Sequence, residues 1–155
     1  MDKIEDTRLD IDNIFNRVFI DLTMQMLSVK MQKQEEFVAL SSAVYCFEIR
    51  TDGAFVSQII FEMDEKVFER IASILYKNYR LTSQESKMYV IEYLNIICGR
   101  ILSEINNALG KRSRLSIPLR IECSKVNQSL ENQANLSYIC LDGSLNIIVY
   151  FEIQG

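Results

Sequence analysis

The dipeptide Asp-Gly occurs twice in this chain, each time between two runs rich in β-branched and aromatic residues. Asp52-Gly53 interrupts SSAVYCFEIRTDGAFVSQIIFEMD, and Asp142-Gly143 interrupts LSYICLDGSLNIIVYFEI. In this setting Asp-Gly is a strong signal for a tight β-hairpin turn. We therefore expect one antiparallel hairpin in each half of the chain. A further strand-like stretch, LSIPLRIECSKV, precedes the second hairpin, and Pro118 within it suits a strand start or edge.

Helical patterns precede and separate the hairpins. Apolar residues recur at helical spacing from residue 9 to residue 31, where Asp10 or Asp12 can cap the start. A second, shorter helix is predicted from residue 64 to residue 79, with acidic residues in its first turn.

The longest helical pattern runs from residue 81 to residue 113. Thr82 with Glu85 has the spacing of a capping box, although Ser83 with Ser86 is an alternative start. Gly110, followed by two basic residues, is a good C-terminal signal.

These elements predict a single α+β domain over residues 1–155, with helices packed on a mainly antiparallel sheet in the order α-β-β-α-α-β-β-β. The length suits one domain, and no linker or low-complexity tract divides the chain. A long helix precedes an Asp-Gly hairpin in both halves. This repetition can reflect internal pseudo-symmetry or coincidence.

Composition excludes several kinds of chemistry. The chain has no histidine, which removes Ser–His and Cys–His nucleophiles and most zinc sites. A net charge of −4 argues against nucleic acid or an anionic membrane surface as the main partner. The acidic start, MDKIEDTRLDID, is not a signal peptide, so we expect a cytoplasmic protein.

The four cysteines form no CxxC pair, and each lies among apolar residues. We therefore expect buried free thiols in a reducing compartment, and neither a disulfide nor a metal site.

One face of the longest helix carries a line of polar residues and a glycine. At about 100° per residue, Asn95, Gly99, Ser103 and Asn106 all fall within about 60° of Glu92. The predicted core face lies opposite and consists of Ile91, Leu94, Ile97, Cys98, Ile101 and Ile105.

A solvated face is the simplest explanation of this line, but its composition favours a docking surface. Gly99 costs a helix interior roughly 1 kcal/mol relative to alanine, and it would let another surface approach the backbone closely. Ile96 and Leu102 are expected to flank the line with exposed apolar area. The residues alone do not say which partner docks.

The same residues resemble the CheX and CheC class of response-regulator phosphatases. The signature of that class is Glu-x-x-Asn on a helix, then a glycine, then Leu-Ser-x-Pro entering a strand. Here these elements are EYLN at 92–95, Gly99, and LSIP at 115–118. The order of helices and strands is also similar over nearly the whole chain.

The resemblance implies hydrolysis of the aspartyl phosphate on a CheY-like receiver domain, in chemotaxis or a related two-component circuit. It implies that Glu92 contacts the active-site lysine of the receiver and that Asn95 inserts toward the phosphoaspartate. An amide can orient a water through one donor and one acceptor without a change in its own charge. The chain would need no cofactor of its own, because the receiver would supply Mg²⁺. Ile96, Gly99, Leu102 and Ser103 would contact the partner.

Two departures from the family pattern matter. Members with two sites repeat Glu-x-x-Asn on the leading helix, whereas here Asp10 and Asn13 are followed by Arg17. We interpret that stretch as a helix cap, which makes the chain similar to the single-site CheX type. Arg100 stands where a smaller residue is expected, and it would either interfere with docking or select a particular receiver.

The resemblance to the single-site CheX type implies a dimer whose subunits associate through their sheets or edge strands. The long strand pattern NIIVYFEI would be prone to association if it lay at an exposed edge. Both points favour a homodimer. Two other functions remain open: a non-catalytic docking module that uses the same helix face, and a structural or ligand-sensing domain whose polar line faces solvent.

Overall fold

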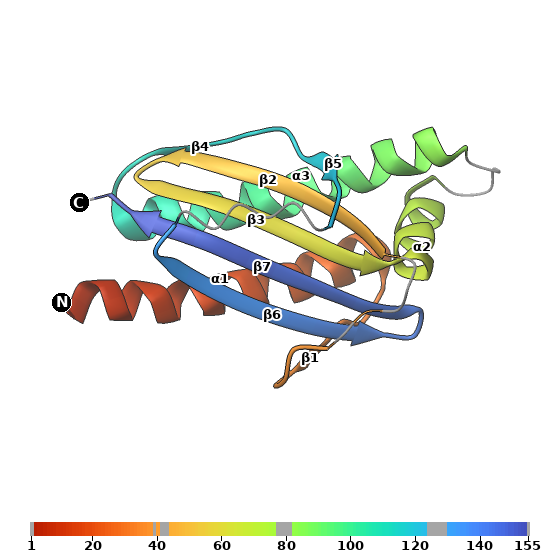
Figure 1. Cartoon of the computed structure of the whole chain (residues 1–155), viewed down its shortest axis with the longest axis horizontal. Coiled ribbons are helices and arrows are strands. Elements are labelled where there is room, and N and C mark those ends of the chain that lie inside the picture. Colours follow the sequence, from red (N-terminus) through yellow and green to blue (C-terminus); the bar gives the residue numbers. More distant parts are fainter. Residues whose placement is uncertain (1, 39, 41–43, 77–81, 124–129, 155) are drawn as a thin grey trace.

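The computed structural model describes residues 2–38, 40, 44–76, 82–123 and 130–154. Three helices and seven strands lie within these residues (Figure 1). Their order is α1 (Asp2–Leu27), β1 (Gln32–Gln34), β2 (Val44–Gly53), β3 (Phe55–Asp64), α2 (Glu65–Tyr76), α3 (Ser83–Leu109), β4 (Ser113–Leu115), β5 (Leu119–Ile121), β6 (Asn132–Cys140) and β7 (Gly143–Ile153).

The strands form one antiparallel sheet in the order β1-β6-β7-β3-β2-β4. β5 also pairs with β2, nearer the start of β2 than β4 does. Both predicted hairpins are confirmed, since β2 pairs with β3 and β6 pairs with β7. The α+β class is confirmed as well. The predicted order lacked β1 and treated β4 and β5 as one strand. β7 lies between β6 and β3 and is not an edge, so its apolar pattern gives no ground for association.

The two halves of the chain are arranged alike. Each has a long helix, then one short strand (β1) or two (β4 and β5), then a hairpin. The last strands of the two hairpins, β3 and β7, meet at the centre of the sheet. The short strand after each long helix pairs with the hairpin of the other half: β1 with β6, and β4 with β2. This exchange supports internal pseudo-symmetry over coincidence.

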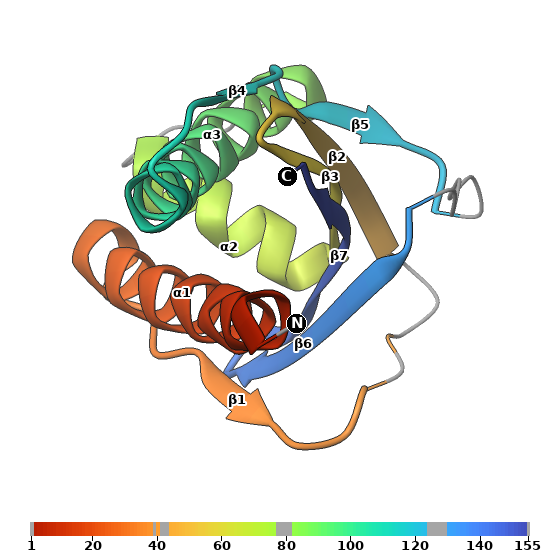
Figure 2. The ribbon, with the colours of Figure 1, turned by 90° about the vertical axis from the view of Figure 1, so that its left-hand side faces the viewer.

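All three helices lie on one face of the curved sheet (Figure 2). That face supplies alternate strand residues to a core shared with the helices, including Phe47, Phe61, Ile147 and Phe151. The outer face carries a smaller apolar cluster of Ile60, Ile148 and Tyr150. The alternation follows from the period of two along a strand.

The predicted helix boundaries are only partly correct. α1 begins at Asp2, so Asp10 lies inside the helix and the interpretation of this stretch as a cap is wrong. α2 ends at Tyr76, and the predicted continuation to residue 79 lies outside the described residues. The Thr82–Glu85 capping box is present, and Gly110 ends α3 with φ 67°.

The cysteines differ from expectation. Cys46 and Cys123 form a disulfide, with Cα atoms 5.3 Å apart, although we expected free thiols. The pairing of β5 with β2 places Ile121 opposite Cys46, which brings Cys123 into reach. A contact across 77 residues of sequence could not be read from local pattern. Cys98 and Cys140 are free thiols as predicted: Cys98 is buried, and Cys140 is half-buried.

Candidate functional site

α3 is enclosed on three sides. Its buried face joins the core shared with the sheet, α1 and α2 pack against it, and β4 runs along its other flank (Figure 2). Most of the predicted core face is confirmed, since Leu94, Ile97, Cys98, Ile101 and Ile105 are all buried. Only a narrow strip of the helix surface is left exposed.

The α1 flank buries a residue that the helix pattern did not assign to the core. Tyr93 is fully buried, and its hydroxyl is 2.5 Å from Oγ1 of Thr23 on α1. Burial raises the pKa of the Tyr93 phenol, so it stays neutral. α1 is tied to the sheet in turn, because the Tyr138 hydroxyl donates to Oδ1 of Asn16 at 2.9 Å. These contacts fix α3 against α1 at Tyr93, the residue that follows Glu92.

The β4 flank overturns one predicted docking residue. Leu102 is only 6% exposed and belongs to the core, so the expectation that it lines the surface is wrong. β4 covers this side of the helix, where the Asn106 amide donates to the carbonyl oxygen of Ser113 at 3.4 Å and Leu115 packs against the same core.

The Leu-Ser-x-Pro motif holds this strand in place. The Ser116 hydroxyl accepts from the backbone N–H of Arg50 at 2.8 Å, and the Ser116 N–H donates to the Arg50 carbonyl at 2.8 Å. Leu115 is half-buried and Pro118 is buried. The motif therefore supports the flank of α3 structurally.

The remaining predicted residues do form one exposed strip along α3. Glu92, Asn95, Gly99 and Ser103 are all exposed, and Ile96 beside them is 44% exposed. Apart from the backbone of its own helix turn and its chain neighbours, a Cβ atom added at Gly99 would meet no atom of the described residues within 4 Å. The packing of this chain thus does not require glycine at position 99, and an open approach to the helix backbone remains.

Arg100 lies beside this strip and not within it. With Arg17, Asp21 and Glu104 it lines a small cavity of about 100 Å³ between α1 and α3. Arg17 donates to a Glu104 carboxylate oxygen at 2.8 Å, which raises the pKa of Arg17. In the two-site pattern a glycine is expected at this position of α1. Here the position is Arg17, whose side chain is paired with Glu104 on α3. Asn13 is exposed, one turn before it.

A pocket that no sequence pattern predicted adjoins Glu92. It has a volume of about 340 Å³ and is lined by Tyr76 at the end of α2 and by Glu85, Met88, Tyr89 and Glu92 on α3. Met88 is 61% exposed. The signal was available in part, since Met88 and Tyr89 lie one helical turn before Glu92.

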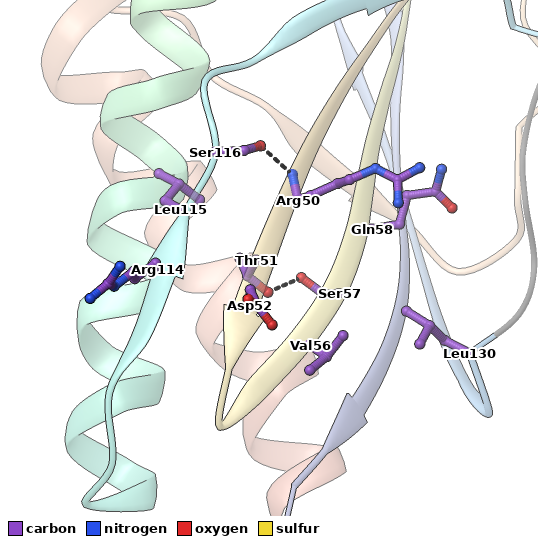
Figure 3. A pocket seen from close by; sticks show the side chains of 10 residues that line it. All are labelled: Arg50, Thr51, Asp52, Val56, Ser57, Gln58, Arg114, Leu115, Ser116 and Leu130. Carbon is purple, nitrogen blue, oxygen red and sulfur yellow. Dashed lines mark hydrogen bonds between the residues drawn. The ribbon is translucent and has the colours of Figure 1, made fainter.

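A second, larger cavity lies on the outer side of the sheet (Figure 3). Its volume is about 510 Å³, and its walls come from β2, β3 and β4, with Arg50, Gln58 and Arg114 among the lining residues. None of the residues predicted for the site lines it. Within the described residues no cluster of acidic or cysteine side chains is arranged to hold a metal ion.

The exposed strip offers a carboxylate, an amide and a gap in the side-chain layer. Glu92 can form an ion pair or hydrogen bonds with a cationic group of a partner. Asn95 can both donate and accept, and its amide forms no side-chain hydrogen bond with the described residues. The strip therefore suits a macromolecule that docks on α3 and brings its own reactive group.

Comparison with solved structures defines the class of fold. CheX from Vibrio vulnificus superposes with a TM-score of 0.74 at 18% identity over 90% of this chain and 95% of that one. A chemotaxis protein from Desulfovibrio vulgaris Hildenborough superposes with a TM-score of 0.75 at 16% identity over 92% and 97%. A CheX–CheY–BeF₃–Mg²⁺ complex from Borrelia burgdorferi gives 0.69 at 20% identity over 90% and 96%.

The sequence matches no curated protein. It does match a family model, described as chemotaxis phosphatase CheX, over residues 45–142. The chain therefore belongs to the CheX family. None of its described helices is long and apolar enough to cross a membrane.

Proposed function

We propose that this protein hydrolyses the aspartyl phosphate of a CheY-like receiver domain that docks on the exposed strip of α3. Membership of the CheX family supports the reaction class, and the Borrelia burgdorferi structure records a CheX protein in complex with CheY. The observation that carries the proposal is the strip itself. It presents Glu92 and Asn95 one helical turn apart, followed by a glycine that this chain does not need for packing.

In this proposal Asn95 is the catalytic residue. Its amide accepts one hydrogen bond from a water and donates another, which holds the water in line with the phosphorus. An acyl phosphate is already activated, so the main task left to the chain is to place the nucleophile. Fixing a nucleophile in attack geometry can contribute several kcal/mol. A glutamine plays the same part in GTP hydrolysis.

Glu92 has a docking role, in which its carboxylate meets the active-site lysine of the receiver. Mg²⁺ would be supplied by the receiver and would stabilise charge on the phosphoryl oxygens. Ile96, Gly99 and Ser103 would contact the receiver backbone and side chains around this point. Leu102 has no part in the contact, because it is buried under β4.

The proposal is tested by the decay of a phosphorylated receiver. A receiver domain of the source organism is phosphorylated with a small acyl phosphate, the donor is removed, and the decay is followed with and without the protein. We expect faster decay with the protein and an unassisted rate with Asn95→Ala. Unchanged decay for every receiver of the organism would exclude the phosphatase function.

The second candidate is a docking module without turnover. It is favoured by Arg100, whose charge borders the strip and has no counterpart in the expected pattern. This candidate predicts that a receiver binds while wild type and Asn95→Ala give the same decay. The decay assay therefore separates the two functions.

We further propose a homodimer, on the family resemblance alone. The ground that the C-terminal strand is an exposed edge is lost, since β7 is central. The edge at β5 leaves Ile117 and Leu119 exposed, at 75% and 59%. Light scattering measures the mass of wild type and of the double variant Ile117→Asp/Leu119→Asp. A dimeric mass for both would place the contact away from the β5 edge.

A further inference from the structure

The pocket beside Glu92 has aromatic walls and an acidic rim. The rings of Tyr76 and Tyr89 have centroids 5.0 Å apart and planes tilted by 59°. Glu85 and Glu92 lie about two turns apart on the same helix and also line the pocket. Met88, which is 61% exposed, completes the lining.

Among the described residues that line this pocket, the charged side chains, Glu85 and Glu92, are both acidic. None of its five lining residues is basic. Lys87 is the only basic residue between Glu85 and Glu92, and it lines a different cavity with Arg120 and Glu122. The pKa of Tyr89 is raised, first by burial and then by the proximity of Tyr76, Glu85 and Glu92. The two carboxylates are thus the smaller causes of this raised pKa, and both line the same pocket as the Tyr89 ring.

Aromatic faces next to carboxylates favour a cation. Lysine and arginine side chains are attracted to tyrosine rings, and arginine also stacks on them. One carboxylate oxygen of Glu85 is engaged with Thr82, at 2.9 Å from the Thr82 hydroxyl, so Glu85 is held in place by the capping box. Within the part of the chain that the structure describes, Glu92 has no such partner, so its carboxylate can turn toward an incoming charge.

We propose that this pocket receives a lysine or arginine side chain from the surface of the docked receiver, and that it thereby selects which receiver is a substrate. This basic group is additional to the active-site lysine that Glu92 is proposed to meet. The inference rests on the proposed function, because Glu92 of the docking strip is also a lining residue of this pocket. Charge complementarity identifies the occupant.

Position 88 allows a test by the sign of the effect. Met88 is exposed, so Met88→Lys and Met88→Glu should both fold, which matched melting temperatures would verify. Receiver domains of the source organism are loaded with BeF₃ and Mg²⁺, the combination present in the Borrelia burgdorferi complex. Binding constants are then measured for both variants and for wild type. No turnover is needed for this measurement.

We expect Met88→Lys to weaken binding at least about fivefold at low salt and Met88→Glu to tighten it about twofold or more, because rim charges steer association. Both effects should shrink at about 0.5 M salt. The control pair is Asn107→Lys and Asn107→Glu. Asn107 is exposed about 29 Å further along the helix axis, and its variants should bind alike.

Each outcome decides between explanations. If the pocket receives an apolar group, both Met88 variants should weaken receiver binding, and this result would overturn the proposal. Equal binding by both variants and wild type would overturn it as well. If the signs are as expected, alanine substitution of one lysine or arginine on the receiver should abolish the difference between the two variants. Binding of no receiver would overturn the proposed function together with this inference, whereas normal turnover with equal binding would overturn this inference alone.

Discussion

At the scale of single residues, three glycines of this chain differ in whether their surroundings would admit a side chain. Gly53 and Gly143 have φ of 115° and 144°, and an added Cβ would lie 2.7 Å from the Arg112 carbonyl oxygen and 2.6 Å from an Asp64 carboxylate oxygen, respectively. Gly99 has open space around it. The Asp-Gly turns therefore need glycine for folding, whereas the packing of the described residues does not require glycine at position 99.

Gly99→Ala should raise the free energy of unfolding by about 0.5–1 kcal/mol, because alanine is the better residue in a helix interior. Gly143→Ala is the matched control and should lower it, since the left-handed backbone and the contact with Asp64 both oppose a Cβ. Chemical denaturation measures both. A loss of stability with Gly99→Ala would show that the glycine serves the fold after all.

Gly99→Gln should leave stability within about 1 kcal/mol of wild type and should abolish receiver binding, because the side chain fills the gap over the helix backbone. Ser103→Ala, one turn along, is the mild control. Binding of a receiver by the glutamine variant as tightly as by wild type would exclude the close approach at this position.

At the scale of elements, the decisive feature is that α3 is packed from three directions. The helical period predicted the polar strip and most of the core face correctly. It could not place Tyr93 or Leu102, because their burial depends on α1 and β4, which the sequence does not position. The capping box, Gly110 and both Asp-Gly turns were predictable because each depends on neighbouring residues alone.

Leu102→Ala should destabilise the protein by about 2–5 kcal/mol, as expected for a leucine removed from a core. Ser103→Ala, at the neighbouring exposed position on the strip, should lower the free energy of unfolding by less than about 0.5 kcal/mol. Urea unfolding of the two variants compares them directly. Similar small losses for both would mean that β4 does not cover this flank.

At the scale of the whole molecule, long-range contacts account for what the sequence left unresolved. Fold class, hairpins and helices followed from period and turn chemistry. The central place of β7 and the pairing of Cys46 with Cys123 depend on which strands become neighbours, and no local pattern contains that. The pocket beside Glu92 likewise requires the end of α2 to meet α3.

The disulfide should contribute about 2–4 kcal/mol to stability, because it closes a loop across 77 residues of sequence. Thermal unfolding with and without a reductant measures this contribution. The wild type should melt lower when reduced, while Cys123→Ser should melt at one temperature under both conditions. Cys98 is buried and unpaired, so it supplies no such dependence. An identical melting temperature for oxidised and reduced wild type would show that the bond is not formed.

The central claim is that the amide of Asn95 places the attacking water, and the most direct measurement is the decay of a phosphorylated receiver with three forms of the protein. We expect wild type to accelerate decay and Asn95→Ala to lose the acceleration while it still binds the receiver. Asn95→Asp should also be slower than wild type, because a negative charge would face the phosphoryl group. Equal acceleration by wild type and Asn95→Ala would contradict the account.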